Sequence, residues 1–346
     1  MKPINYLILL ALPATVIAGY YLGGWFNFLV PVCCFFAYPV ANLFLSSSEK
    51  HAHNAQSFSS SAYKAVALIF VPVLSVLTAW CVYIVYTSGL NIVEFTGLVV
   101  SLGVVNSVIG FTLAHEFIHH FNKAEKAAGY FLLLQNNYMH YGIEHVYGHH
   151  VYACTPVDPH TAHAGESIYA FLPRAIFKTY TNAVVIERKR LLRSNTKKQF
   201  LHNRIVWFAV MQVALMLAIL FLLNIYALLF FVLQNMVAII LLHIINYLQH
   251  YGLMREINTA GKYEKINMHH AWNTGKKNTS LNLFQLENHA DHHVHPHKNF
   301  NELKHTENSP QHPAGYSFMV LLALVPPLWF KIMNKRISTY TSNTPT

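Results

Sequence analysis

Long apolar segments constrain this chain more than any other feature of its sequence. A helix needs roughly 20 apolar residues to cross the hydrocarbon core of a bilayer. Six stretches approach or reach that length: 4–22, 25–45, 64–86, 92–114, 205–223 and 226–247. Only 11% of the residues are charged, whereas soluble domains carry charges on about a quarter of their residues. We therefore expect an all-α integral membrane protein with six transmembrane helices and a histidine-rich cap of helices and loops.

The positions of the charged residues predict the topology. The short connections near 23–24, 87–91 and 224–225 contain no Lys, Arg, Asp or Glu. Basic residues gather at the opposite ends of the predicted crossings, most densely in ERKRLLRSNTKKQF at 187–200. Because loops rich in Lys and Arg stay in the cytoplasm, we expect both termini and every long loop there, in a bacterial inner membrane. The net charge of +10 follows from the same bias and does not indicate nucleic-acid binding.

The predicted crossings divide a single membrane domain into four parts. These parts are 1–114 with four transmembrane helices, the cytoplasmic segment 115–204, 205–247 with two transmembrane helices, and the cytoplasmic segment 248–346. Nearly all of the 23 histidines lie in the two cytoplasmic segments. Near the end of the chain, GYSFMVLLALVPPLWFKIM is apolar but contains Pro326 and Pro327. Proline interrupts a helix, so we expect a buried or interfacial segment there and not a seventh crossing.

The sequence contains clusters of histidine whose spacing suits metal binding. In HEFIHH, His115 and His119 are one helical turn apart, so both imidazoles lie on one face of a helix and suit one shared metal ion. In EHVYGHH, His145 and His149 have the same spacing and form a second predicted pair. The adjacent His150 then points elsewhere, toward a second ion.

A third cluster and one isolated histidine extend this set. In ENHADHHVHP, His289, His292 and His293 stand at i, i+3 and i+4, and His250 lies at the cytoplasmic end of the sixth predicted helix. A catalytic zinc ion takes three protein ligands, so nine imidazoles at one membrane face exceed what one zinc ion uses. They suffice for two ions of about four to five ligands each. Imidazole ligands by themselves suit iron, zinc, copper or nickel.

Two other classes of protein fit parts of the pattern. HEFIH matches the HExxH motif of zinc peptidases, in which two His bind the metal and the Glu acts as base. An intramembrane peptidase would need a third ligand, commonly an Asp on another helix, and no Asp occurs within the six predicted crossings. A metal transporter would need polar groups along its helices. We expect few of them, with His243 and Glu94 as exceptions, so both classes are disfavoured.

Several segments, taken together and in this order, resemble the signatures of the integral-membrane histidine-box diiron family, which includes fatty-acyl desaturases. They are HEFIHH, EHVYGHHVYACTPVDPHTAHAGES, INYLQHYGL, LFQLENHADHHVHP and PAGYSFMVLLALVPPLWFKIM. The resemblance is closest to the alkane 1-monooxygenase branch and covers most of the chain from residue 92 onward. Two departures are Gln249, where alkane monooxygenases commonly have Glu, and LENH in place of LQRH.

The resemblance implies an O2-dependent enzyme that converts the terminal C–H bond of an n-alkane into a primary alcohol. It implies two non-haem iron ions, electrons from rubredoxin, and an NAD(P)H-dependent reductase that reduces the rubredoxin. The implied iron ligands are His115, His119, His145, His149, His150, His250, His289, His292 and His293. The departures leave aromatic methyl hydroxylation of the xylene type and fatty-acyl desaturation or hydroxylation as alternatives.

Acidic residues near the ligand positions are candidates to orient the imidazoles, because groups around a metal site fix its ligands. Glu116, Glu144 and Asp291 stand next to predicted ligands, although helix capping or solvation explains them equally well. Asp158 and Glu166 belong to the polar segment TPVDPHTAHAGES. We place both of them near the site.

The remaining histidines and the basic run are less specific. His120, His140, His269 and His270 are weaker ligand candidates. We expect the others to be solvated or structural: His51, His53, His160, His163, His202, His243, His295, His297, His305 and His312. The basic run at 188–204 has two interpretations, contact with lipid headgroups and docking of an acidic electron donor.

Overall fold

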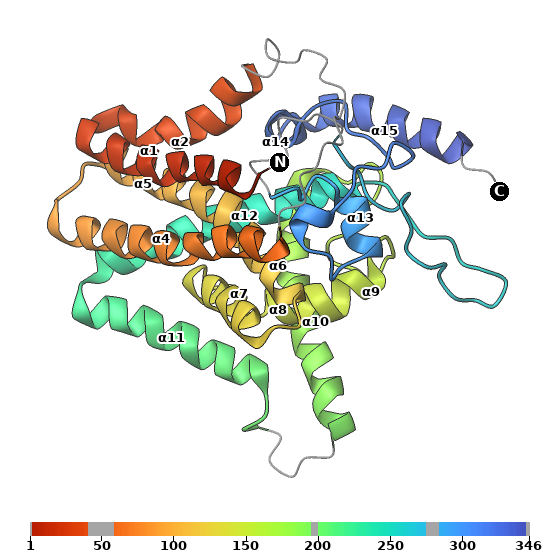
Figure 1. Ribbon diagram of the computed structural model, residues 1–346, viewed down its shortest axis with the longest axis horizontal. Coiled ribbons are helices and arrows are strands. Elements are labelled where there is room, and N and C mark those ends of the chain that lie inside the picture. Colours follow the sequence, from red (N-terminus) through yellow and green to blue (C-terminus); the bar gives the residue numbers. More distant parts are fainter. Residues whose placement is uncertain (1, 41–58, 195–199, 275–283, 344–346) are drawn as a thin grey trace.

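The computed structural model describes residues 2–40, 59–194, 200–274 and 284–343 (Figure 1). These ranges are built of helices and loops, with two isolated bridges in place of strands. Within them, five helical segments are long and apolar enough to cross a membrane. They are Pro3–Leu22, Ser60–Thr87, Ile92–His119, Arg204–Leu222 and Ile225–His250. The chain is thus a multi-pass membrane protein of all-helical class, as predicted.

The first span joins a 3-10 helix (Pro3–Leu10) to α1 (Ala11–Leu22), and the second is α4 (Ser60–Thr87). The third span consists of α5 (Ile92–Val105), a π-helical stretch (Asn106–Phe111) and α6 (Thr112–His119). The last two spans are α11 (Arg204–Leu222) and α12 (Ile225–His250). α12 packs against α4, α5 and α11, so it is the central helix of the bundle (Figure 1).

One of the six predicted crossings is not confirmed. The stretch 25–45 is described as far as Val40, and its residues 41–45 lie outside the described residues. Its helical part comprises a 3-10 helix (Gly24–Phe28), α2 (Leu29–Val32) and a π-helix (Cys33–Ala37). Gly24–Val40 is apolar but shorter than the five spans. The structure therefore supports five crossings.

The third span is longer than the predicted helix at 92–114. It continues to His119, and the backbone leaves the helical conformation at His120, where ψ is 151°. Hydropathy ended the helix too early because polar residues replace apolar ones in its last turns. His115 and His119 accordingly lie on the span itself and not in a segment that follows it.

Most of the other elements gather at one end of the spans, next to the ends of α6 and α12 (Figure 1). After α6 come α7 (Lys123–Gln135), α8 (Tyr141–Glu144), a π-helix (His145–His149), α9 (His150–Tyr152) and α10 (Ile168–Ser194). After α12 come α13 (His289–Val294), a 3-10 helix (Phe300–Glu302), α14 (Tyr316–Ala323) and α15 (Pro326–Asn343). They form the predicted histidine-rich cap.

The apolar segment near the end of the chain is divided as expected. α14 ends at Ala323 and α15 begins at Pro326, and neither belongs to the five spans. Trp329 is fully buried, and its ring centroid lies 5.2 Å from those of Tyr247 and Tyr251 at the end of α12. The segment therefore packs against α12.

Buried polar side chains connect the spanning helices, contrary to our expectation that such groups are rare in them. Asn106 donates to Gln234 of α12 at 2.9 Å and lies 3.4 Å from Thr78 of α4. Gln135 of α7 also bonds Thr78 and accepts from Ser75 at 2.9 Å. Because these groups form hydrogen bonds across helices, they connect the helices to one another.

A buried carboxylate joins α10 to the start of α11. Glu187 is 1% exposed and accepts hydrogen bonds from the guanidinium groups of Arg190 and Arg204, both at 2.7 Å. It also accepts from the backbone N–H of Arg204 at 2.7 Å. Burial raises the pKa of Glu187, but these bonds outweigh burial and lower it to about 2.

We expect Glu187→Gln to lower the thermal unfolding midpoint at pH 7, because losing the charge in these bonds costs about 1–3 kcal/mol. The folded-state pKa lies below the unfolded value of about 4.3, so the stabilisation is complete well above pH 5. It is lost as the pH falls toward the folded-state value. Thermal scans in detergent should therefore show a smaller difference between wild type and variant at pH 4 than at pH 7. Equal midpoints at pH 7 would contradict this account.

Candidate metal centre

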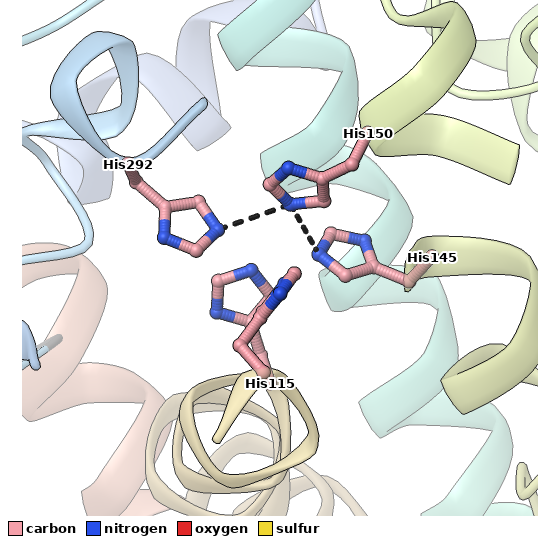
Figure 2. Close-up of side chains that lie close together, drawn as sticks. His115, His145, His150 and His292 are labelled. Carbon is pink, nitrogen blue, oxygen red and sulfur yellow. Dashed lines mark hydrogen bonds between the residues drawn. The ribbon is translucent and has the colours of Figure 1, made fainter. Parts of the chain in front are cut away.

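Five of the nine predicted histidines converge in one group, here called group one. Each offers one ring nitrogen, and these five atoms lie within 4.8 Å of one another. The members are His115 and His119 of α6, His145 of the π-helix, His150 of α9 and His292 of α13. Figure 2 shows the rings of His115, His145, His150 and His292 directed toward one another from separate elements.

The other four predicted histidines form a second group, here called group two, under the same 4.8 Å limit. They are His149, His250, His289 and His293, and all four are buried. The Nε2 atom of His293 lies 3.1 Å from that of His250 and 3.0 Å from that of His289. Groups one and two therefore contain all nine histidines between them, with none shared.

The spacing of the ring nitrogens suits ligands of a common ion. In group one, the Nε2 atom of His150 lies 3.1 Å from those of His145 and His292 (Figure 2). Two nitrogens that bind one ion at about 2.1 Å and at a right angle are about 3.0 Å apart. The Nε2 atoms of His115, His119 and His149 are buried without a hydrogen-bond partner among the described residues. Such orphaned nitrogens are rare, and a metal ion would satisfy them.

The charge state of the imidazoles also fits metal binding. Burial, together with the neighbouring histidines, lowers the pKa of His145, His150, His289, His292 and His293 well below the usual value. These rings are therefore neutral at pH 7 and keep a lone pair available, which is the form that binds metal. Both groups could hold a metal ion.

The pairing within the second histidine segment differs from our prediction. We expected His145 and His149 to share an ion, yet His145 belongs to group one with His150, and His149 belongs to group two. The reason is local, because His145–His149 is a π-helix. In a π-helix the repeat is i to i+5, so His145 and His150 come together. The four-residue spacing that holds for His115 and His119 does not apply here.

Asp158 bonds directly to a member of group two. Its two carboxylate oxygens both lie 3.1 Å from Nδ1 of His149. The hydroxyl of Thr161 donates to Asp158 at 2.6 Å, and the backbone N–H of His160 donates at 3.2 Å. Burial raises the pKa of Asp158, but His149 and Thr161 outweigh it and hold this pKa below the usual value. The ionised carboxylate therefore orients His149 and leaves Nε2 for a metal.

His250 is oriented by groups that sequence reasoning missed. Its Nδ1 lies 3.2 Å from the backbone carbonyl of His270 and 3.6 Å from the sulfur of Cys154. Cys154 donates to the same carbonyl at 2.8 Å. No signal in the sequence connects these positions, because only the fold brings 154, 250 and 270 together.

The three acidic residues proposed to orient ligands bond other groups. Glu116, Glu144 and Asp291 are all buried, but their hydrogen bonds in the described structure go to residues outside the nine histidines. The partners are His120 and Phe300 for Glu116, His160 for Glu144, and His295, Lys298 and Lys304 for Asp291. These bonds connect segments that adjoin the two histidine groups. Glu166, which we placed near the site, bonds Arg174 at 2.8 Å.

Several histidines outside the two groups are structural. His160 is fully buried, with Nε2 2.7 Å from Glu144 and Nδ1 2.8 Å from the amide of Asn246. It stacks on His243 at 5.3 Å, and His243 bonds the hydroxyl of Tyr138 at 2.7 Å. Of the weaker ligand candidates, His120 bonds Glu116 and Glu125, His270 bonds Glu264, His140 packs on Tyr138, and His269 is exposed.

A small cavity adjoins group one. Its volume is about 10 Å³, enough for roughly one water molecule. The lining residues are Thr112, His115, Glu116, Phe284, Leu286, His292 and Leu303. Two members of group one therefore face this cavity together with three apolar side chains.

The fold and the site define a multi-pass membrane protein whose two buried histidine groups could each hold a metal ion. The profile of the fatty acid desaturase family matches residues 91–320. Alkane 1-monooxygenase 2 of Alcanivorax borkumensis is 37% identical over 80% of this chain and 72% of its own length. Alkane 1-monooxygenase 1 of Pseudomonas aeruginosa is 35% identical over 85% of this chain and 78% of its own length. The xylene/toluene monooxygenase hydroxylase component of Pseudomonas putida is 26% identical over 97% of this chain and 89% of its own length.

The chain therefore belongs to the fatty acid desaturase family and, within it, to the alkane 1-monooxygenases. It is an enzyme of this type.

Proposed function

We propose that this protein hydroxylates the terminal carbon of n-alkanes with O2 and releases primary alcohols. The observation that carries this proposal is the convergence of nine histidines, eight of them buried, into two adjacent groups at one end of a membrane bundle. The relatives named alkane 1-monooxygenase support the substrate class, and they are more similar to the chain than the xylene/toluene relative is. Aromatic methyl groups and acyl chains are the alternative substrates.

We infer that group one and group two each hold one iron ion. Zinc fits imidazole ligands but has no redox chemistry, and hydroxylation of an alkane is an oxidation. When bound, iron supplies the activation of O2 and the oxidation of the C–H bond, while the protein supplies position and a dry site. The nine ligands in this proposal are His115, His119, His145, His149, His150, His250, His289, His292 and His293.

The cavity beside group one suits the end of an apolar substrate. An alkane has no polar group that could form a hydrogen bond with the protein. Its affinity must therefore come from burial of its apolar surface, at about 0.8 kcal/mol per CH2. Phe284, Leu286 and Leu303 give the cavity apolar walls next to His115 and His292. We infer that the terminal carbon enters this cavity and that these walls exclude water from it.

We expect Leu286→Phe to lower kcat/KM for alkanes about 10-fold or more, because a larger side chain in a small cavity displaces the reacting carbon. Leu286→Met, which conserves volume, is the matched control and should hydroxylate near the wild-type rate. Iron content, measured on both variants, should match wild type. If Leu286→Phe hydroxylated as fast as Leu286→Met, the cavity would not be the position of the reacting carbon.

The reaction requires electrons from outside the chain. Its balance is R–H + O2 + 2 e⁻ + 2 H⁺ → R–OH + H2O. The four cysteines are unpaired, and no cysteine belongs to a potential metal group among the described residues, so an internal cysteine-ligated electron carrier has no support. We propose rubredoxin as the donor, reduced by an NAD(P)H-dependent reductase. We also propose that the histidine-bearing end and both termini face the cytoplasm of a bacterial inner membrane.

The contacts of Glu116 argue against a zinc peptidase. In a peptidase the Glu of HExxH must activate a water molecule. Here Glu116 accepts hydrogen bonds from the backbone N–H of Phe300 at 2.8 Å and from the ring of His120 at 3.1 Å. Moreover, His115 and His119 share their group with three further histidines. This arrangement suits a metal centre that performs redox chemistry.

Product analysis by gas chromatography and mass spectrometry tests the proposed function. Membranes that contain the protein would receive rubredoxin, its reductase and NADH, with octane, hexadecane and toluene together. We expect 1-alkanols, and none from His292→Ala membranes. Benzyl alcohol alone would assign the protein to the aromatic methyl hydroxylases. If no alcohol formed although the protein held two irons per chain, the substrate class would be wrong, and acyl chains would be tested next.

A further inference from the structure

Helix α10 lies outside the spans and carries exposed apolar side chains. It runs across the general direction of α4 and α11 (Figure 1), and it is not one of the five spans. One face is buried against the protein through residues that include Phe171, Ala175, Thr179 and Ala183. On another face, Phe177 is 69%, Tyr180 48%, Val184 38% and Leu192 62% exposed.

The exposed residues form one stripe. The steps from Phe177 to Tyr180 and from Tyr180 to Val184 are three and four residues, and Leu192 follows eight residues, about two turns, later, with the basic Arg188 midway between Val184 and Leu192. Residues at such spacing lie on one side of an α-helix. A row of large apolar side chains with this much exposed surface indicates contact with an apolar phase or partner.

The contacts of the α7–α8 turn show which way the stripe faces. The ring of Tyr180 lies 5.2 Å from that of His140 in this turn. The backbone N–H of Met139, the preceding residue, donates to Gln212 at 2.9 Å. Gln212 lies in the middle of α11, which is a span from Arg204 to Leu222. The stripe of α10 therefore faces the side on which α11 enters the bilayer.

Basic side chains lie near the end of the stripe, with Arg188 within it and Lys189 and Arg193 beside it. Arg188, Lys189 and Arg193 are exposed and form no ion pair within the described part of the chain. α10 ends at Ser194, and the span α11 begins at Arg204. The guanidinium group of Arg204 donates a hydrogen bond to Glu187 of α10. These cations consequently lie at the level where α11 leaves the hydrocarbon core, which is the level of the lipid headgroups.

We propose that α10 lies in the plane of the membrane surface as an interfacial helix that binds anionic phospholipids. The stripe of Phe177, Tyr180, Val184 and Leu192 enters the acyl boundary, and Arg188, Lys189 and Arg193 bind lipid phosphates. An apolar face with basic flanks is the pattern of helices that lie at the interface. Because α10 packs on α8, which leads into His145, the lipid contact holds the second histidine segment in place.

Photocrosslinking in lipid nanodiscs tests the position of the stripe. Benzoylphenylalanine would replace Val184 on the stripe and, as a control, Lys262 in an exposed loop of the cap. The nanodiscs would contain phosphatidylcholine and phosphatidylglycerol in equal amounts. After irradiation, we expect phospholipid adducts on the chain labelled at 184 and at most background on the chain labelled at 262. Equal adduct formation at the two positions would overturn the proposal.

Neutralisation of the cations tests the headgroup contact. Each basic residue near an anionic surface strengthens binding by about five-fold, so phosphatidylglycerol should be enriched among the adducts at 184. Arg188→Gln, Lys189→Gln and Arg193→Gln, combined, should reduce this enrichment to the bulk lipid ratio while adducts persist. Unchanged enrichment would overturn the role of the cations. Unchanged enrichment with a higher KM for reduced rubredoxin would assign them to donor docking instead.

Discussion

His292→Ala is expected to lower the iron content from two ions per chain to about one and to lower alkanol formation more than 100-fold. His292 reaches group one from α13, and its Nε2 lies 3.1 Å from that of His150 (Figure 2). It is the only member of group one that comes from this part of the chain. The substitution removes the one ring nitrogen that α13 contributes to group one. Metal analysis of the purified protein and product analysis of membranes would measure both effects.

His295→Ala is the matched control for this experiment. His295 follows His292 by three residues, but its side chain is about half exposed and bonds Asp291 at 2.7 Å. It belongs to neither group, so the variant should retain two irons and near-normal activity. Two irons in the His292→Ala protein would show that His292 is not a ligand. A similar loss in both variants would point to disruption of α13 and not to removal of a ligand.

Asp158→Asn is expected to weaken metal binding in group two about 10- to 100-fold, the usual effect of removing a group that orients a ligand. The substitution keeps the size of the side chain but removes the charge that faces Nδ1 of His149. The amide nitrogen must also face one of its donor neighbours, Thr161 or the backbone of His160. Group one has no bond to Asp158 in the described structure and should keep its metal.

Graded chelation would measure this effect. Wild-type and Asp158→Asn proteins would be incubated with increasing chelator, and the iron remaining per chain would be counted. We expect the variant to lose one iron at chelator concentrations that leave wild type intact. Thr161→Val, which removes one donor to Asp158 and keeps its charge, should give a smaller shift. Identical chelation curves for wild type and Asp158→Asn would show that Asp158 does not support a metal ligand.

The sequence was sufficient to predict which histidines come together but not how they divide. Each cluster lies on its own short helix, so periodicity could place its members on one face. The division depends on the π-helix at His145–His149, which changes the repeat by one residue. No propensity marks EHVYGHH as a π-helix in advance. The assignment of His150 and His149 to different groups was predicted, whereas the partner of His145 was not.

Contacts between distant segments were beyond sequence reasoning. Glu116 and Glu144 are adjacent in sequence to histidines of group one, yet the helix turns their carboxylates toward His120 and His160. Asp158 bonds His149 from nine residues away, across a turn that brings the chain back. Adjacency along the chain was therefore a poor guide to the groups that orient the histidines of the two groups, because neighbours on a helix point in different directions.

Metal analysis of the purified wild-type protein, combined with Mössbauer spectroscopy after growth on ⁵⁷Fe, would test the central claim most directly. The two histidine groups predict two iron ions per chain and iron signals from nitrogen-rich, non-haem sites. One zinc ion per chain and no bound iron would contradict the claim. That result would return His115, Glu116 and His119 to the interpretation of a zinc peptidase motif.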